Sequence, residues 1–207
     1  MPRKPRLQLP DVLYHITTRG VEKRDIFIGR KTYVVFLSVL EQTVLRYGWI
    51  CHSYCLMKNH YHLAIETPLA NISAGMQFLK GEYASWFNAT NSREGALYER
   101  RFRDTIADDE AAVLQLSRYI VLNPVRAGFV SHPEEWPWSS YNATIGLVKR
   151  PRFLSTKPTL DLFGGGARGA ARFAEFVEEE LLSSRPGMSP RDVSGSDPDT
   201  SRMDMAA

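Results

Sequence analysis

The stretch LMKNHYHLAIE, Leu56–Glu66, places two histidines one residue apart at the start of an apolar segment. In an extended chain successive side chains point to opposite faces, so His60 and His62 share one face while Tyr61 takes the other. Their Cα atoms would lie roughly 6.6 Å apart, at about 3.3 Å per residue. Two imidazoles at that spacing can converge on one metal ion, with nitrogen–metal distances of about 2.0–2.1 Å. From this pattern alone, two half-buried structural histidines are an equally good interpretation.

The segments on either side predict four strands and three helices. Pro124 disfavours helical geometry at Asn123, so we expect the third helix to end there. The order strand, helix, strand, strand, helix, strand, helix predicts an α+β fold: a ferredoxin-like split βαβ sandwich, with an antiparallel sheet, helices on one face and an added helix. The expected elements are strands at 13–18, 49–57, 60–67 and 96–106, a hairpin turn at Lys58-Asn59, and helices at 30–47, 72–88 and about 108–123.

Length and composition predict one main domain with an extension. The chain has 207 residues, of which 43% are hydrophobic, enough for a real core. We assign residues 1–145 to the main domain, 146–184 to an extension with an FGGGARGAA linker and a short helix at 172–182, and 185–207 to a tail of disordered composition. No run approaches the roughly 18 apolar residues of a membrane span, and no secretory signal is apparent. These features predict a cytoplasmic protein without a membrane partner.

Positive charge is concentrated in two groups, although the net charge is only +3. Such groups raise the odds of a phosphate-rich partner, with nucleic acid the first to test. On a strand, Arg101 and Arg103 would share one face and Arg100 would take the other. The first thirty-one residues hold three acidic residues against Arg3, Lys4, Arg6, Arg19, Lys23, Arg24, Arg30 and Lys31, and the second group is Arg93, Arg100, Arg101 and Arg103.

Tyr119 and Asn123 lie four residues apart in LSRYIVLNPVRAG, which puts them on one helical face about 6 Å apart along the axis. One amide oxygen added to two imidazoles gives three mixed ligands, which suit Mg²⁺ or Mn²⁺ better than a closed structural zinc site. A phenolic hydroxyl beside them is a nucleophile. On spacing alone, however, Tyr119 also fits a core residue and Asn123 a helix-ending residue.

Taken together and in this order, four segments resemble the single-tyrosine HUH transposases, particularly the REP-associated tyrosine transposases. The resemblance covers Tyr14 to Tyr141. YHITTRGVEKRDIF resembles the family's first strand and basic turn, MKNHYHLAIE its H-hydrophobic-H strand, LYERRFRDTI its aromatic and basic strand, and YIVLNPVRAG its catalytic helix.

The resemblance implies a role for each of these residues. Tyr119 would be the nucleophile, and His60, His62 and Asn123 would hold Mg²⁺ or Mn²⁺, although insertion-sequence relatives commonly have glutamine where Asn123 stands. The implied reaction cuts and rejoins single-stranded DNA at hairpin-forming repeats through a 5′-phosphotyrosine, in a monomer or a homodimer. The residues expected to bind DNA are Arg19, Lys23, Arg24, Arg100, Arg101 and Arg103.

Two other functions remain open from the sequence. A non-catalytic nucleic-acid-binding domain of ferredoxin-like fold would expose aromatic residues on its central strands. A hydrolytic metallonuclease would need several carboxylates, whereas only Glu66 shares the histidine face. His15 lies on the first predicted strand, where it could flank the site, and we interpret it as structural. We interpret Trp136 and Trp138 as covering the edge of the core, with stacking on an unpaired base as the alternative for both.

Overall fold

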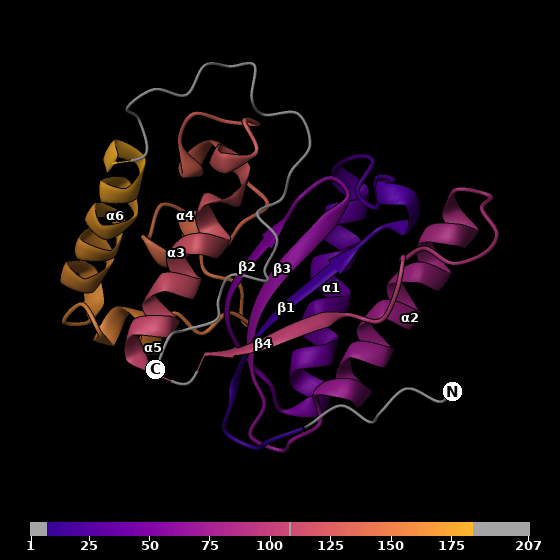
Figure 1. Ribbon diagram of the computed structural model, residues 1–207, viewed down its shortest axis with the longest axis horizontal. Helices are drawn as coiled ribbons and strands as arrows, with labels where there is room; N and C mark the ends of the chain where they lie inside the picture. The colour runs from indigo at the N-terminus through magenta and orange to yellow at the C-terminus, as the bar shows by residue number, and fades with distance from the viewer. Residues whose placement is uncertain (1–7, 108, 184–207) are drawn as a thin grey trace.

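The computed structural model describes residues 8–107 and 109–183, which form a sheet between two helical layers (Figure 1). Helices α1 and α2 cover one face of the sheet, and α3 lies on the other with α6 outside it. In chain order the elements are β1 Leu13–Arg19, η1 Val21–Lys23, α1 Arg30–Tyr47, β2 Ile50–Leu56, β3 His60–Glu66, α2 Ile72–Thr90, β4 Arg103–Ala107, α3 Glu110–Arg126, η2 Pro133–Glu135, α4 Tyr141–Thr144, α5 Lys157–Asp161 and α6 Gly166–Ser183.

The sheet has the strand order β2-β3-β1-β4, and all three neighbouring pairs are antiparallel. This order confirms the predicted α+β, ferredoxin-like sandwich, with α3 as the added helix. The register pairs His62 with Thr17 and His60 with Arg19, so the histidines lie in the centre of the sheet.

The hairpin at Lys58-Asn59 is also confirmed. Met57 N donates to His60 O at 2.9 Å, which closes the turn just before β3. The backbone N–H groups of Ile26 and Phe27 both donate to Lys58 O at 2.9 Å. The start of β3 is therefore held from both sides by backbone hydrogen bonds.

The prediction of a strand over 96–106 was wrong for most of its length, because β4 comprises only Arg103–Ala107. Leu97 and Tyr98 are consecutive, yet both are buried. Both pack into the same apolar core, and Tyr98 is joined to the sheet by an isolated bridge to Gly20. The segment before β4 therefore approaches the sheet irregularly instead of as a regular strand.

The predicted end of the third helix at Asn123 was also wrong, since α3 continues through Pro124 to Arg126. Proline lacks the N–H that would donate to Ile120 O one turn earlier. The Asn123 side chain compensates in part, because its Nδ2 lies 3.5 Å from Ile120 O, although its shorter bond, at 2.8 Å, goes to Tyr119 O. A local side-chain donor thus allows the helix to pass the proline.

The linker predicted at FGGGARGAA is instead largely the beginning of α6. Phe173 and Val177, four residues apart, are buried against α3. A Cβ atom at Gly169 would lie 2.6 Å from Leu160 O, so this glycine permits close packing of α5 and α6 rather than flexibility. The domain division after residue 145 stays a prediction, and the predicted tail, 185–207, lies outside the described residues.

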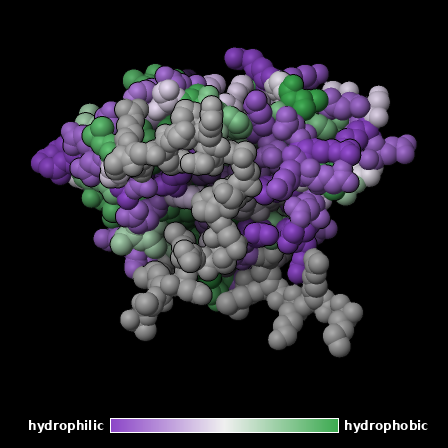
Figure 2. Space-filling model, turned by 45° about the horizontal axis from the view of Figure 1, so that its top comes forward, coloured by the Kyte–Doolittle hydropathy of each residue, from purple (hydrophilic) through white to green (hydrophobic). Residues whose placement is uncertain are grey.

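The face of the molecule drawn in Figure 2 is mixed in character. Figure 2 shows hydrophobic residues as small separate patches among hydrophilic ones. Of the helices in the described part of the chain, none is both long enough and apolar enough to cross a bilayer.

Candidate active site

The histidine pair lies on the sheet face that α3 covers. Alternation along β3 sends Tyr61, Leu63 and Ile65 into the core under α1 and α2, and sends His60 and His62 to the opposite face. The two imidazoles have a centroid distance of 5.0 Å and an interplanar angle of 82°. Their Nε2 atoms are both buried and have no hydrogen-bond partner among the described residues. Buried imidazole nitrogens of this kind suit a metal ion, which would supply the missing partner.

The other nitrogen of each imidazole is engaged. His62 Nδ1 lies 3.0 Å from His15 Nε2, and His60 Nδ1 lies 2.6 Å from Asn59 Oδ1. If each Nδ1 donates its proton in these contacts, each Nε2 keeps a lone pair for a metal. His15 on β1 therefore has a role beyond packing, because its hydrogen bond can fix the tautomer of His62.

Burial keeps these imidazoles neutral. Desolvation lowers the pKa of His60 to about 4, with a further effect from the Arg19 charge. Desolvation likewise holds the pKa of His62 well below its ordinary value, and the neighbouring His60, His15 and Arg19 add to the effect. Neutral imidazoles at neutral pH are the form that binds metals.

Tyr119 projects from α3 onto the histidines. Its ring meets both His15 and His62 edge-on, with centroid distances of 5.6 Å to each. The structure therefore brings together residues that lie more than fifty positions apart in the sequence, as the site prediction requires. The roles of these residues stay predictions.

Two arginines act on the Tyr119 hydroxyl. The pKa of Tyr119 is raised, because desolvation outweighs the lowering effects of the Arg126 and Arg19 charges and of a hydrogen bond with the Asn123 side chain. The Arg126 guanidinium lies 5.0 Å from the centroid of the Tyr119 ring and pairs with Glu180 at 2.7 Å. Arg19, paired in register with His60, is on the histidine face of β1. Positive charge at these positions favours a phenolate and attracts a phosphate.

Asn123 is buried one turn beyond Tyr119. Because its Nδ2 is directed to the helix carbonyls, Oδ1 is the end of the amide that can serve as an acceptor or ligand. Within the described residues, no three His, Cys, Asp or Glu side chains gather closely enough to hold a metal. A metal site here would therefore need the two histidines together with another kind of ligand, such as this amide oxygen, a water molecule or a substrate phosphate.

The other predicted DNA-binding residues are dispersed. Lys23 and Arg24 are exposed in and after η1, where Arg24 pairs with Glu22 at 2.6 Å. Arg103 begins β4 and pairs in register with Thr17, which also pairs with His62, so Arg103 lies on the histidine face. Arg100 and Arg101 precede the strand, so their faces no longer follow from strand alternation. Arg100 pairs with Glu99 at 2.5 Å.

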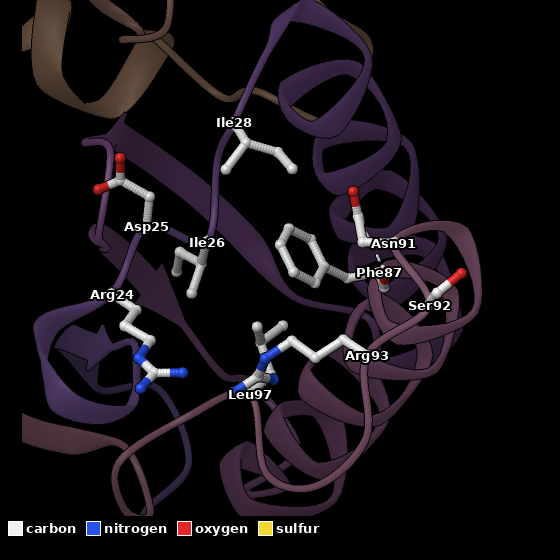
Figure 3. A pocket seen from close by; sticks show the side chains of 9 residues that line it. All are labelled: Arg24, Asp25, Ile26, Ile28, Phe87, Asn91, Ser92, Arg93 and Leu97. Carbon is white, nitrogen blue, oxygen red and sulfur yellow. Dashed lines mark hydrogen bonds between the residues drawn. The ribbon is translucent and has the colours of Figure 1, made fainter.

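One residue from each basic group lines a hollow of about 410 Å³ (Figure 3). Arg24 and Arg93 stand beside an apolar lining that includes Ile26 and Phe87. Helix α2 supplies Phe87 and covers the sheet face opposite α3. This hollow is therefore separate from the histidine site.

Sequence reasoning missed two residues of the site. A structural role was preferred for His15 over a position flanking the site, yet it lies two positions from Thr17, which pairs with His62, and on the same face. Strand pairing could have revealed this contact. Arg126 follows Tyr119 by seven residues, which is two helical turns, but the predicted helix end at Asn123 concealed that spacing.

Comparison with known proteins identifies the family. The family model described as "Transposase IS200 like" matches residues 8–123, more than half of the chain. The chain therefore belongs to the IS200-like transposase family.

Two relatives are more specific. The chain is 25% identical, over 140 residues, to a Haemophilus influenzae protein assigned to the REP-associated tyrosine transposases; the match covers 62% of this chain and 80% of the relative. A solved structure of a REP-associated tyrosine transposase bound to a REP hairpin is similar with a TM-score of 0.62 and 15% identity, over 75% of this chain and 92% of that one. This second likeness shows the shared fold.

Proposed function

We propose that this transposase is a metal-dependent single-stranded DNA endonuclease and strand transferase, with Tyr119 as nucleophile. One observation carries the proposal: Tyr119 packs against His62 where the Nε2 atoms of His60 and His62 are buried without partners. A nucleophile and two metal-ligand atoms thus meet on one face of the sheet. The substrate would be DNA that forms hairpins at repeated sequences, because a structural relative is bound to a REP hairpin.

The reaction is a transesterification. Tyr119 Oη attacks a backbone phosphorus, a phosphotyrosine bond forms to the 5′-phosphate side, and the P–O3′ bond breaks to release a 3′-hydroxyl. The tyrosine proton leaves as the attack proceeds and a proton is taken up by the departing 3′-oxygen. The phosphodiester energy is conserved in the adduct, so another 3′-hydroxyl can reverse the step without ATP. The charges of Arg19 and Arg126 offset part of the rise that burial causes in the pKa of Tyr119, which eases loss of the proton during the attack.

His60, His62 and Asn123 would hold Mg²⁺ or Mn²⁺. When bound, such an ion polarises the scissile phosphate and offsets the negative charge that develops on it. His15 and Asn59 hold the Nδ1 side of the two imidazoles, which directs Nε2 toward the ligand position.

The structure argues against a simple nucleic-acid-binding domain. Recognition of RNA on an open sheet requires exposed aromatic residues on the central strands. Tyr14 and Tyr61, on β1 and β3, have no exposed surface and lie beneath α1 and α2. The sheet face with these aromatics is therefore closed to bases.

A hydrolytic metallonuclease is also disfavoured. Glu66 is the one carboxylate of β3 on the histidine face, and its Oε2 is bonded to His52 Nε2 at 2.8 Å. Activation of a water by several carboxylates is therefore not available at this position.

A labelled hairpin oligonucleotide with single-stranded flanks tests the proposal. We expect the wild-type protein with Mg²⁺ or Mn²⁺ to form a protein–DNA adduct that survives denaturation, together with a free 3′-hydroxyl fragment. A chelator should stop the reaction, and added ion should restore it. Cleavage without an adduct would favour water as the nucleophile, and activity indifferent to a chelator would contradict the metal role.

A further inference from the structure

Phe129 presents an exposed aromatic ring just beyond the helix that carries Tyr119. Its side chain is 43% exposed, and in the described part of the chain it is the one Phe, Tyr or Trp residue that is exposed rather than buried or half-buried. Aromatic side chains usually bury most of their large surface. An exposed ring at this position calls for a physical reason.

The ring is held in place from two sides. Phe129 N donates to Pro124 O at 2.9 Å, which fixes the backbone to the end of α3. The ring stacks on Trp136, with a centroid distance of 5.6 Å and an interplanar angle of 27°, and Trp136 Nε1 donates to Leu56 O at 3.1 Å. Phe129 is thus exposed in an ordered position.

An exposed cation accompanies the ring. Lys58 Nζ lies 5.1 Å from the Phe129 centroid. Lys58 belongs to the turn that leads into His60, whereas Phe129 follows the helix that carries Tyr119 and Asn123. The ring and the ammonium therefore border the two elements that form the candidate active site.

We propose that Phe129 is a stacking platform for one unpaired base of the DNA strand, and that Lys58 binds a backbone phosphate of that strand. This inference rests on the proposed function, since it names how single-stranded DNA is held beside the same site. Proteins that bind single strands combine stacking rings with positive charge in this way.

The strengths of the two interactions favour a DNA base over the Lys58 ammonium as the partner of the Phe129 ring. A cation–π contact at an exposed site changes an equilibrium by about two- to fivefold. Stacking of a base on an aromatic side chain is worth about 5- to 150-fold. A base can therefore displace Lys58 from the ring and leave the ammonium to pair with phosphate. Bases inside a duplex are already stacked, so the platform selects unpaired strands.

Binding of a short oligothymidylate, compared with a duplex of the same length, tests the proposal. Phe129→Leu keeps the apolar contact with Trp136 but removes the ring, and we expect it to weaken single-strand binding by about 5- to 150-fold. Phe129→Tyr keeps the ring and should bind like wild type, and duplex binding should change little in either variant. Leu45→Ala, at an exposed aliphatic position on α1, is the matched control and should have no effect.

A fluorescent 2-aminopurine in the single strand gives a second readout, because stacking quenches its emission. Quenching by wild type and Phe129→Tyr, but not by Phe129→Leu, would support the platform. If wild type binds the single strand and Phe129→Leu binds and quenches equally, the platform is wrong while the proposed function stands. If wild type binds the hairpin oligonucleotide but not this strand, the platform is wrong while the proposed function stands; if it binds neither, both are overturned.

Discussion

The two faces of β3 are equally buried but chemically opposite. Toward α1 and α2, Tyr61, Leu63 and Ile65 enter an apolar core, where the Tyr61 ring packs 4.6 Å from that of Phe36. Toward α3, His60 and His62 are 7% and 3% exposed, and they bring two imidazoles next to each other whose Nε2 atoms have no partner among the described residues. Tyr61 Oη on the core face is also buried without a partner among these residues, but no histidine of β3 lies on that face.

This difference shows that burial alone does not mark a functional residue. Packing side chains gain free energy from leaving water, whereas a buried nitrogen without a partner costs about 1–3 kcal/mol. Alternation along one strand lets both kinds of residue coexist, because each step of one residue changes the face. Substitutions on the two faces should therefore have separable effects.

The largest expected effect is on the reaction itself. Tyr119→Phe removes only the attacking oxygen, so cleavage and adduct formation should fall by at least about a thousandfold. DNA affinity and the free energy of unfolding should change little, by less than about 1 kcal/mol. A gel assay and thermal unfolding would check this. Cleavage retained by Tyr119→Phe would remove Tyr119 from its role.

A paired substitution on adjacent residues separates the two faces directly. His62→Ala should weaken divalent-ion binding by more than about 100-fold, and His60→Ala should act likewise. Leu63→Ala should leave ion affinity intact but lower the free energy of unfolding by about 2–5 kcal/mol. Calorimetry with Mn²⁺ and chemical unfolding measure the two quantities. Equal ion affinity in His62→Ala and wild type would contradict the claim that the two faces of β3 have separate roles.

A smaller effect on ion affinity is expected from His15, which contacts His62 and not the proposed ion. His15→Phe removes the partner of His62 Nδ1 and should lower Mn²⁺ affinity by about 10- to 100-fold. His15→Gln retains a polar side chain and should recover part of the affinity. Mn²⁺ binding unchanged in His15→Phe would return His15 to a purely structural role.

Asn123 offers a test in which one side chain has two roles. Asn123→Asp keeps an oxygen ligand but loses the N–H donor to Tyr119 O, so stability should fall by about 1 kcal/mol while ion binding persists. Asn123→Ala should lose both. Unfolding curves and Mn²⁺ titrations compare the two variants, and weaker ion binding by the aspartate than by the alanine variant would contradict the ligand role.

The smallest effect concerns the exposed basic residues. If Arg101 and Arg103 each contact a phosphate, replacing both with alanine should flatten the slope of log affinity against log salt by about 1.4, at about 0.7 per contact. The rate of adduct formation at saturating enzyme should remain comparable. An unchanged slope would move the binding surface to Arg19, Lys23 and Arg24.

The sequence predicted the fold well wherever local pattern and packing agree. The alternation of β3 and the apolar stripe of α1 specified their elements, and α1 begins and ends at the predicted residues. Prediction failed where a long-range or side-chain contact overrides the local signal. Pro124 did not end α3 because Asn123 supplies a donor, and the glycines of FGGGARGAA did not make a linker because Gly169 packs against Leu160.

The site was predictable in part for the same reason. The faces of His60 and His62 follow from alternation, and the shared face of Tyr119 and Asn123 from helical spacing. The bond from His15 to His62 depends on the register of β1 against β3, which no local pattern specifies. The proximity of Arg126 to Tyr119 depends on the continuation of α3 past the proline.

The most direct test of the central claim is to map the covalent adduct. The wild-type protein would be incubated with a hairpin oligonucleotide and Mn²⁺, digested with nuclease and protease, and analysed by mass spectrometry. We expect a nucleotide linked through its 5′-phosphate to the peptide that contains Tyr119, and to no other tyrosine. Attachment at a different residue, or cleaved DNA with no modified peptide, would contradict it.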